Sequence, residues 1–93
     1  MLDIGGDIGA AVITTPAALK GEELEIRSSP GGWTGRHVAV LPRPLGATTP
    51  CAAVFPSLVA GRWVVRRRRR PDDTTELELD IGGGHVTSVN WPG

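Results

Sequence analysis

The sequence contains a single cysteine, Cys51, so the chain cannot form an internal disulfide, and a reducing compartment is the expected location. No apolar run approaches the roughly 20 residues that a membrane-spanning helix needs. The first residues also lack the basic start and apolar centre of a signal peptide. We therefore expect a soluble, cytoplasmic protein with no membrane partner.

A net charge is also missing. The 10 Lys and Arg residues balance the 10 Asp and Glu residues, and the formal net charge is zero. Proteins dedicated to nucleic acids usually carry an excess of basic residues. The composition therefore predicts that nucleic acid is not the partner.

Uninterrupted windows of helical length are scarce. The 13 glycines and 8 prolines are spread along the whole chain, and both residue types disfavour helix interiors. The apolar residues occur in short bursts rich in Val and Ile, which is typical of strands. Since 93 residues suffice for one modest core, we predict a single domain over residues 1–93. The predicted fold class is all-β, an antiparallel β-sandwich of about seven strands with at most one helical turn.

The expected strands follow from alternation and turn residues. The first, at residues 8–14, is apolar on both faces, which favours a central position. A helical turn should follow it, with Thr15 as the N-cap and Pro16 at the first helical position. The seven strands are expected at residues 8–14, 23–27, 37–41, 51–55, 61–69, 76–81 and 85–91. The predicted core consists of Val12, Leu24, Ile26, Val38, Val40, Phe55, Leu58, Trp63, Val65, Leu77 and Leu79.

The segment Phe55-Pro56-Ser57-Leu58-Val59-Ala60-Gly61-Arg62-Trp63 joins the fourth and fifth expected strands. It resembles the aromatic-x-x-Leu-x-x-Gly-x-aromatic signature of prealbumin-like sandwiches, which include carboxypeptidase-regulatory-like domains. The resemblance implies that Leu58 closes one end of the sandwich and that Gly61 begins a strand whose Trp63 enters the core. It implies no catalytic residue, because such sandwiches host many functions.

The wider sequence, with GDIGAAVITTPAAL, HVAV and AAVFPSLVAGRWVV, also resembles short uncharacterised actinobacterial proteins. That resemblance favours a domain that stands alone. It adds no chemistry.

Five consecutive arginines at residues 66–70 form the most unusual motif. Such a run suggests nuclear targeting or a phosphate-binding patch. An acidic alternating strand at residues 76–81 follows it, and a three-residue loop at 71–73 would join the two strands into a hairpin. In that register the apolar residues share one face and the opposite charges pair across the strands.

The predicted pairs of this hairpin are Arg66 with Glu78, Arg68 with Glu76, and Val65 with Leu79. Because charge pairing explains most of the run, we favour a structural role over a nucleic-acid role. Arg69 and Arg70, near the tip, stay candidates for contact with an anion, although Asp72 and Asp73 beside them weaken that interpretation.

The pentapeptide LDIGG occurs twice, at residues 2–6 and 79–83. Its Asp-x-Gly-Gly element resembles the phosphate loop of sugar kinases and actin-like ATPases. Those proteins need two α/β domains, and a glycine cradle for phosphate needs a helix N-terminus after it. Strand-like sequence follows both copies here, so we predict two strand-to-turn junctions. The second should be a tight hairpin turn at Gly82 to Gly84.

His37, His85 and Cys51 are the candidate metal ligands. They lack the local spacing of a zinc site, so a site would exist only if the strands brought them together near Asp3 or Asp80. The simpler interpretation is a buried cysteine and two surface histidines.

Trp33 lies in a polar, glycine-rich loop at residues 28–36. It could stack against a ligand or a partner, or fold back over one end of the sandwich, and we favour the second arrangement.

These observations predict a small non-enzymatic binding module without a cofactor. Its ligand is an unidentified protein or small molecule, with Trp33, Arg69 and Arg70 as candidate contacts. The alternative is a small metal-binding protein or enzyme that uses His37, His85 and Cys51. The uncharged stretch at residues 37–41, if it lies at a sheet edge, is where we expect a homodimer to form.

Overall fold

The computed structural model describes residues 5–44, 46–70 and 72–92. Within them the chain forms eight strands and one short 3₁₀ turn, which confirms the prediction of an all-β sandwich. No helix in these ranges is long and apolar enough to cross a membrane. The elements are β1 (Ile8–Thr15), η1 (Ala17–Leu19), β2 (Glu23–Ser28), β3 (His37–Ala39), β4 (Leu41–Pro42), β5 (Cys51–Val59), β6 (Gly61–Arg67), β7 (Glu76–Ile81) and β8 (Val86–Asn90).

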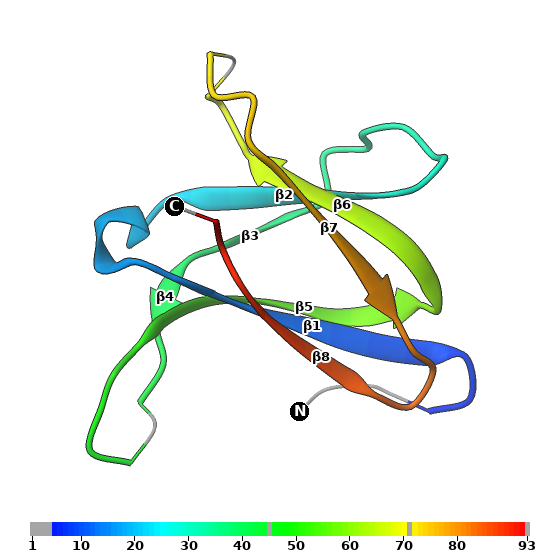
Figure 1. Cartoon of the computed structure of the whole chain (residues 1–93), viewed down its shortest axis with the longest axis horizontal. Coiled ribbons are helices and arrows are strands. Elements are labelled where there is room, and N and C mark those ends of the chain that lie inside the picture. Colours follow the sequence, from blue (N-terminus) through cyan, green and yellow to red (C-terminus); the bar gives the residue numbers. More distant parts are fainter. Residues whose placement is uncertain (1–4, 45, 71, 93) are drawn as a thin grey trace.

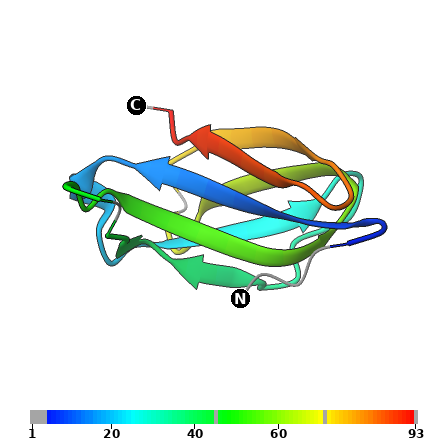
Figure 2. The ribbon, with the colours of Figure 1, turned by 90° about the horizontal axis from the view of Figure 1, so that it is seen from below.

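The strands form two four-stranded sheets that lie one above the other in Figure 1. Sheet A has the order β4-β5-β1-β8, and sheet B has the order β3-β2-β6-β7. All strand pairs are antiparallel except β1 with β8, which run parallel. Figure 2 looks onto the outer face of sheet A, with β5 and β1 in its middle. The first strand is therefore central, as its apolar faces predicted.

The core lies between the two sheets. In β1, Ala11 and Ile13 point inward and are fully buried, and the residues between them point outward because a strand alternates its faces. The buried cluster contains Ala11, Ile13, Leu24, Ile26, Val40, Cys51, Ala53, Phe55, Leu58, Val65, Leu79, Ile81 and Trp91.

Most of the predicted core is confirmed by this cluster. Val38, Trp63 and Leu77 are only partly buried, and they pack against its edge. Val12 was assigned to the wrong face, since Ala11 and Ile13 take the inward positions of β1. Trp63 packs against the buried cluster, and its indole Nε1 donates a hydrogen bond of 2.8 Å to the Val59 carbonyl.

The predicted strand at residues 37–41 is in fact two short strands in different sheets. Both β3 and β4 lie at the edge of their sheets. Val40, fully buried, links them: its N–H donates to the Glu22 carbonyl at 2.8 Å, and its carbonyl accepts the Gly21 N–H at 2.9 Å. The expectation of an edge is confirmed, but each edge strand has at most three residues.

The end of the chain also differs from its prediction. The glycine turn after β7 does not close a hairpin, because β8 crosses to sheet A and pairs in parallel with β1. His85 lies in this turn and not in the strand. Two element bounds differ as well. Strand β5 continues to Val59. Thr15 is the last residue of β1, and Pro16 occupies the N-cap position of η1.

The β6–β7 register is displaced by two residues from the predicted one. The observed pairs are Val65 with Leu77, Arg66 with Glu76 and Trp63 with Leu79. The displacement keeps every side chain on its predicted face because the pleat repeats every two residues. The observed register leaves a longer connection than predicted, from the end of β6 at Arg67 to the start of β7 at Glu76, in which the Asp73 N–H donates to the Arg70 carbonyl at 3.0 Å. Of the predicted loop at 71–73, Pro71 lies outside the described residues.

The glycines of the two LDIGG copies lie against each other. Residues 2–4 are outside the described ranges, but Gly5 and Gly6 turn the chain just before β1. A Cβ atom on Gly83 would overlap the Gly6 carbonyl oxygen, and one on Gly9 would overlap the Gly82 carbonyl oxygen. The second copy is confirmed as a strand end followed by a turn. The close approach of the two glycine segments was not apparent from either copy alone.

Candidate functional site

Charged side chains gather on the outer face of sheet B and beyond one end of it. In β2, Leu24 and Ile26 point into the core, so Glu23, Glu25 and Arg27 point outward. Strand β6 lies between β2 and β7, so its outward arginines can reach carboxylates on both sides.

The middle of this face is closed by Trp33. The guanidinium carbon of Arg66 lies 3.8 Å from the centre of the Trp33 ring, and that of Arg27 lies 5.1 Å away. Arg66 also donates from Nε to Glu25 Oε1 at 3.0 Å, and the Glu25 side chain is only 8% exposed. Cation–π contact and ion pairing together hold the loop that carries Trp33 over the sheet. The predicted position of Trp33 over one end of the sandwich is therefore wrong.

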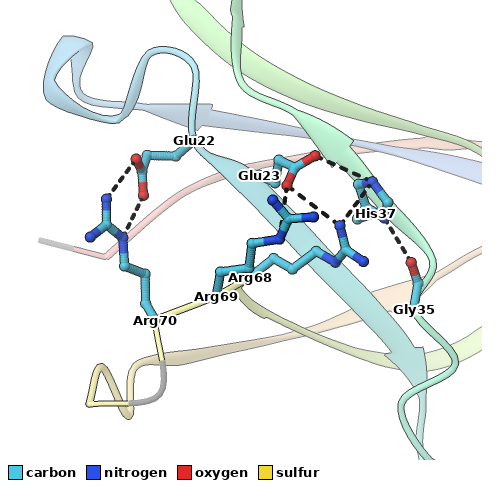
Figure 3. A network of polar contacts seen from close by, with 7 residues as sticks. All are labelled: Glu22, Glu23, Gly35, His37, Arg68, Arg69 and Arg70. Atoms are coloured by element: carbon cyan, nitrogen blue, oxygen red, sulfur yellow. Dashed lines mark hydrogen bonds and ion pairs between the residues drawn. The ribbon is translucent and has the colours of Figure 1, made fainter.

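Four arginines continue past this pair toward the end of the hairpin. Together with the carboxylates that they contact, they form what we call the arginine cluster: Arg67, Arg68, Arg69, Arg70, Glu22, Glu23 and Asp73. Figure 3 shows that the arginines of the loop meet glutamates from the beginning of β2. The partners predicted on β7 are not the ones used.

Glu22 holds two of these arginines. Arg70 donates from Nε and Nη2 to the two Glu22 oxygens, each at 2.9 Å, and Arg67 donates to Oε1 at 2.8 Å. These charge-assisted hydrogen bonds from Arg70 and Arg67 lower the pKa of Glu22 to about 2. The same contact raises the pKa of Arg70.

Asp73 fixes the returning side of the loop. The backbone N–H of Thr75 donates to Asp73 Oδ1 at 2.9 Å, and Arg67 donates to Oδ2 at 3.2 Å. Both contacts favour the ionised form, chiefly the bond from Thr75, and the pKa of Asp73 is lowered.

His37 belongs to the same network. Its Nδ1–H donates to the Gly35 carbonyl at 2.7 Å, because a carbonyl can only accept, and its Nε2 lies 3.3 Å from an Arg68 nitrogen. Glu23 Oε2 is also 3.3 Å from Nε2 (Figure 3). A ring nitrogen that faces a guanidinium is poorly placed to bind a cation.

The other candidate metal ligands lie elsewhere. Cys51 begins β5 and is buried in the core, whereas His85 is exposed in the turn before β8. Asp80 pairs with Arg62, and Asp3 lies outside the described residues. Among the described residues, no group of three or more His, Cys, Asp or Glu side chains is arranged to hold a metal ion.

Two hollows lie beside the arginine cluster and share Arg69 and Arg70 as walls. The first, of about 360 Å³, presents four arginines and two acidic residues: Arg66, Arg67, Arg69, Arg70, Asp73 and Glu76, with Thr74 between them. The second, of about 290 Å³, is lined by Gly21, Glu22, Glu23, Ala39, Arg68, Arg69 and Arg70. Positive charge thus predominates on the walls of the first hollow.

Arg69 differs from its neighbours in the cluster. Its backbone has a φ of 63°, in the left-handed region, and its side chain is 76% exposed. The contact from its Nε to Glu23 Oε1 is 3.9 Å long, well beyond a hydrogen bond. The sequence identified Arg69 correctly as an exposed arginine near the tip, whereas Arg70, also predicted to be free, is bound by Glu22.

Arg62 is placed at the opposite end of β6. It donates to Glu78 and Asp80 on β7, at 3.1 Å in both cases, and lines neither hollow. It therefore serves as a matched arginine outside the cluster.

The sequence analysis missed the acidic half of the cluster. The signal was present in Glu22-Glu23-Leu24-Glu25, where three carboxylates precede or alternate with core residues. Proximity in the chain favoured the acidic strand β7 as the partner, whereas Arg67, Arg68 and Arg70 pair with Glu22 and Glu23 at the beginning of β2.

No protein-family model matches this chain, and comparisons with curated proteins and with solved structures gave no match. The fold and the arginine cluster are therefore the basis of the functional interpretation.

Proposed function

We propose that this protein is a non-enzymatic binding module that takes up an anionic group of its ligand in the first hollow, beside Arg69. The exposed guanidinium of Arg69, at the rim of a hollow walled mainly by arginines, is the observation that supports it most directly. The prealbumin-like resemblance is consistent with a scaffold that presents loops for binding.

The chemistry of the walls favours a carboxylate or a phosphate. A guanidinium presents several N–H donors in one plane and matches such groups with paired hydrogen bonds. A volume of about 360 Å³ lies near the lower end for ligand pockets, so the site suits one compact anionic group of a larger ligand.

The internal carboxylates give the site its selectivity. Arg67 and Arg70 already pair with Glu22 and Asp73, so a weak anion gains little by displacing these carboxylates. Arg69 has a weaker internal partner, since its Nε lies 3.9 Å from Glu23 Oε1, and its donors are therefore easier to redirect to a ligand. The expected ligand is therefore one whose anionic group reaches Arg69 first.

Calorimetric titration of the purified protein tests this function with two probes, pyrophosphate and a hexaglutamate peptide. We expect at least one of them to bind with a one-to-one stoichiometry and an affinity that falls as salt is added. Hexalysine serves as the probe of opposite charge and should give no heat of binding.

Two variants sharpen the test. Arg69→Gln should weaken binding of the probe about tenfold, which corresponds to about 1.4 kcal/mol. Arg62→Gln removes the same charge from the other end of β6 and should leave the affinity within about twofold. Equal losses in both variants, or no binding of either probe to the wild type, would refute an anion site beside Arg69.

A further inference from the structure

We propose that the outer face of sheet A is a self-association surface, through which two copies of this chain stack face to face as a weak dimer. This surface is separate from the arginine cluster, which belongs to sheet B.

The four strands of sheet A contain no Asp, Glu, Lys, Arg or His. The strands of sheet B contain such residues in every strand. Two sheets of equal strand number in one small domain thus differ completely in charge.

The register identifies which side chains of sheet A point outward. Strand pairing places outward side chains in rows: Leu41, Ala52, Thr14 and Asn90 in one row, and Val54, Val12 and Ser88 in the next. Ala10 with Val86, and Ile8 with Val59, continue the same face toward the other end. Figure 2 shows the four strands that carry these rows.

The exposed apolar side chains are concentrated on this face. Among the described residues, the large hydrophobic side chains that are exposed are Leu41 at 45%, Val59 at 52% and Val86 at 44%, and all three belong to these rows. Ala10 and Ala52 belong to the same rows and are buried.

The absence of charge from the strands of sheet A favours a second copy of this chain as the partner that covers the face. A charged partner would lose hydration on this face without gaining an opposite charge, which is costly. A two-fold axis brings identical surfaces together, so strands that carry no charge meet no like charge from the same strands of a second copy. The zero net charge of the chain also removes long-range repulsion between copies.

The available area sets the strength of the dimer. The sheet face is four strands wide, at about 4.8 Å per strand, and about five residues long, at about 3.3 Å per residue. Its area is therefore roughly 300 Å² per copy. The uneven surface of the side chains increases this area. The total accessible surface buried by both copies nevertheless stays below the roughly 1,200 Å² of stable interfaces. The dimer should therefore be reversible and visible only at high concentration.

Sedimentation equilibrium of the full chain, from about 10 µM to about 1 mM, tests the proposal. The wild type should shift from monomer toward dimer across this range. The double variant Val59→Lys/Val86→Lys places a charge on both sides of the face and should weaken the dimer at least tenfold.

Ala39→Lys is the matched control, since it adds a lysine to the edge strand β3 of sheet B. It should leave the dimer within about twofold, and thermal unfolding should show that all variants are folded. A wild type that stays monomeric at 1 mM would overturn the proposal. So would a dimer that the Val59/Val86 variant leaves intact, or one that Ala39→Lys weakens as strongly.

Discussion

Glu22 is the residue that organises the arginine cluster. It stands just before β2 and accepts hydrogen bonds from Arg67 and Arg70, which come from the end of β6 and the loop beyond it. Its side chain is 23% exposed, so the contacts are partly shielded from water. One carboxylate thereby ties the beginning of β2 to a segment 45 or more residues further along the chain.

This geometry predicts a pH dependence. The pKa of Glu22 is about 2 in the folded protein against a reference value of 4.5, so the ionised form stabilises the fold above pH 4.5. That contribution should be lost as the pH falls from 4.5 to 2. The unfolding midpoint of the wild type should therefore drop over this range more than that of Glu22→Gln.

Carboxyl chemical shifts provide the direct measurement. The Glu22 carboxyl should titrate near pH 2 in the wild type and at a higher pH in Arg70→Gln, because Arg70 is its main partner. A Glu22 titration near pH 4.5 in the wild type would contradict the ion pairs seen in the structure.

At the scale of elements, the pairing of β2 with β6 positions the ion pair between Glu25 and Arg66. Glu25 faces Arg66 across the two strands, and Trp33 lies against Arg66 on the outside. A carboxylate that is 8% exposed is stable only with a charged partner beside it.

Removal of that partner should therefore be costly. Arg66→Leu leaves the Glu25 carboxylate buried and unpaired, and we expect it to destabilise the fold by about 2–3 kcal/mol. Arg62→Leu breaks ion pairs whose side chains are more than half exposed, and it should cost below about 1 kcal/mol.

Denaturant unfolding of both variants measures this difference. The double variant Arg66→Leu/Glu25→Leu should recover part of the loss, because no buried charge then stays unpaired. Equal stabilities of Arg66→Leu and Arg62→Leu would show that Glu25 does not depend on Arg66.

The elements also show what the sequence could predict. Strand positions and inward faces follow from alternation over a few residues, and those predictions for β1, β2, β6 and β7 are largely confirmed. The predicted register failed because a displacement of two residues keeps every apolar side chain on its face. The observed register comes with a longer connecting loop, in which Arg69 has a left-handed backbone and Asp73 accepts hydrogen bonds from Arg67 and Thr75, and alternation along the strands does not reveal these contacts.

At the scale of the whole molecule, the two sheets present opposite surfaces. Sheet B is covered by paired charges and by Trp33, and it leads to the arginine cluster at one end. Sheet A carries no charge in its strands. This division gives the molecule one surface suited to an anionic ligand and another suited to a second copy.

The division could not be predicted from local patterns. The sequence indicated two arginines at the tip of a hairpin, and the exposure of Arg69 agrees with that prediction. The chain changes sheets between β1 and β2, between β3 and β4, between β5 and β6, and between β7 and β8, and the sequence did not indicate the changes at Val40 and at Gly82 to Gly84. Such crossings are decided by tertiary packing, and the local sequence resembles an ordinary strand or hairpin turn.

The most direct test of the central claim is a map of backbone amide shifts in ¹⁵N-labelled protein during titration with the probe that binds, pyrophosphate or hexaglutamate. The largest shifts should fall on the residues that line the first hollow, Arg66, Arg67, Arg69, Arg70, Asp73, Thr74 and Glu76, with smaller ones at residues 21–23. Residues of β1, β5 and β8 should not respond. Shifts centred on sheet A, or spread evenly over all basic residues including Arg62, would contradict a binding site at the arginine cluster.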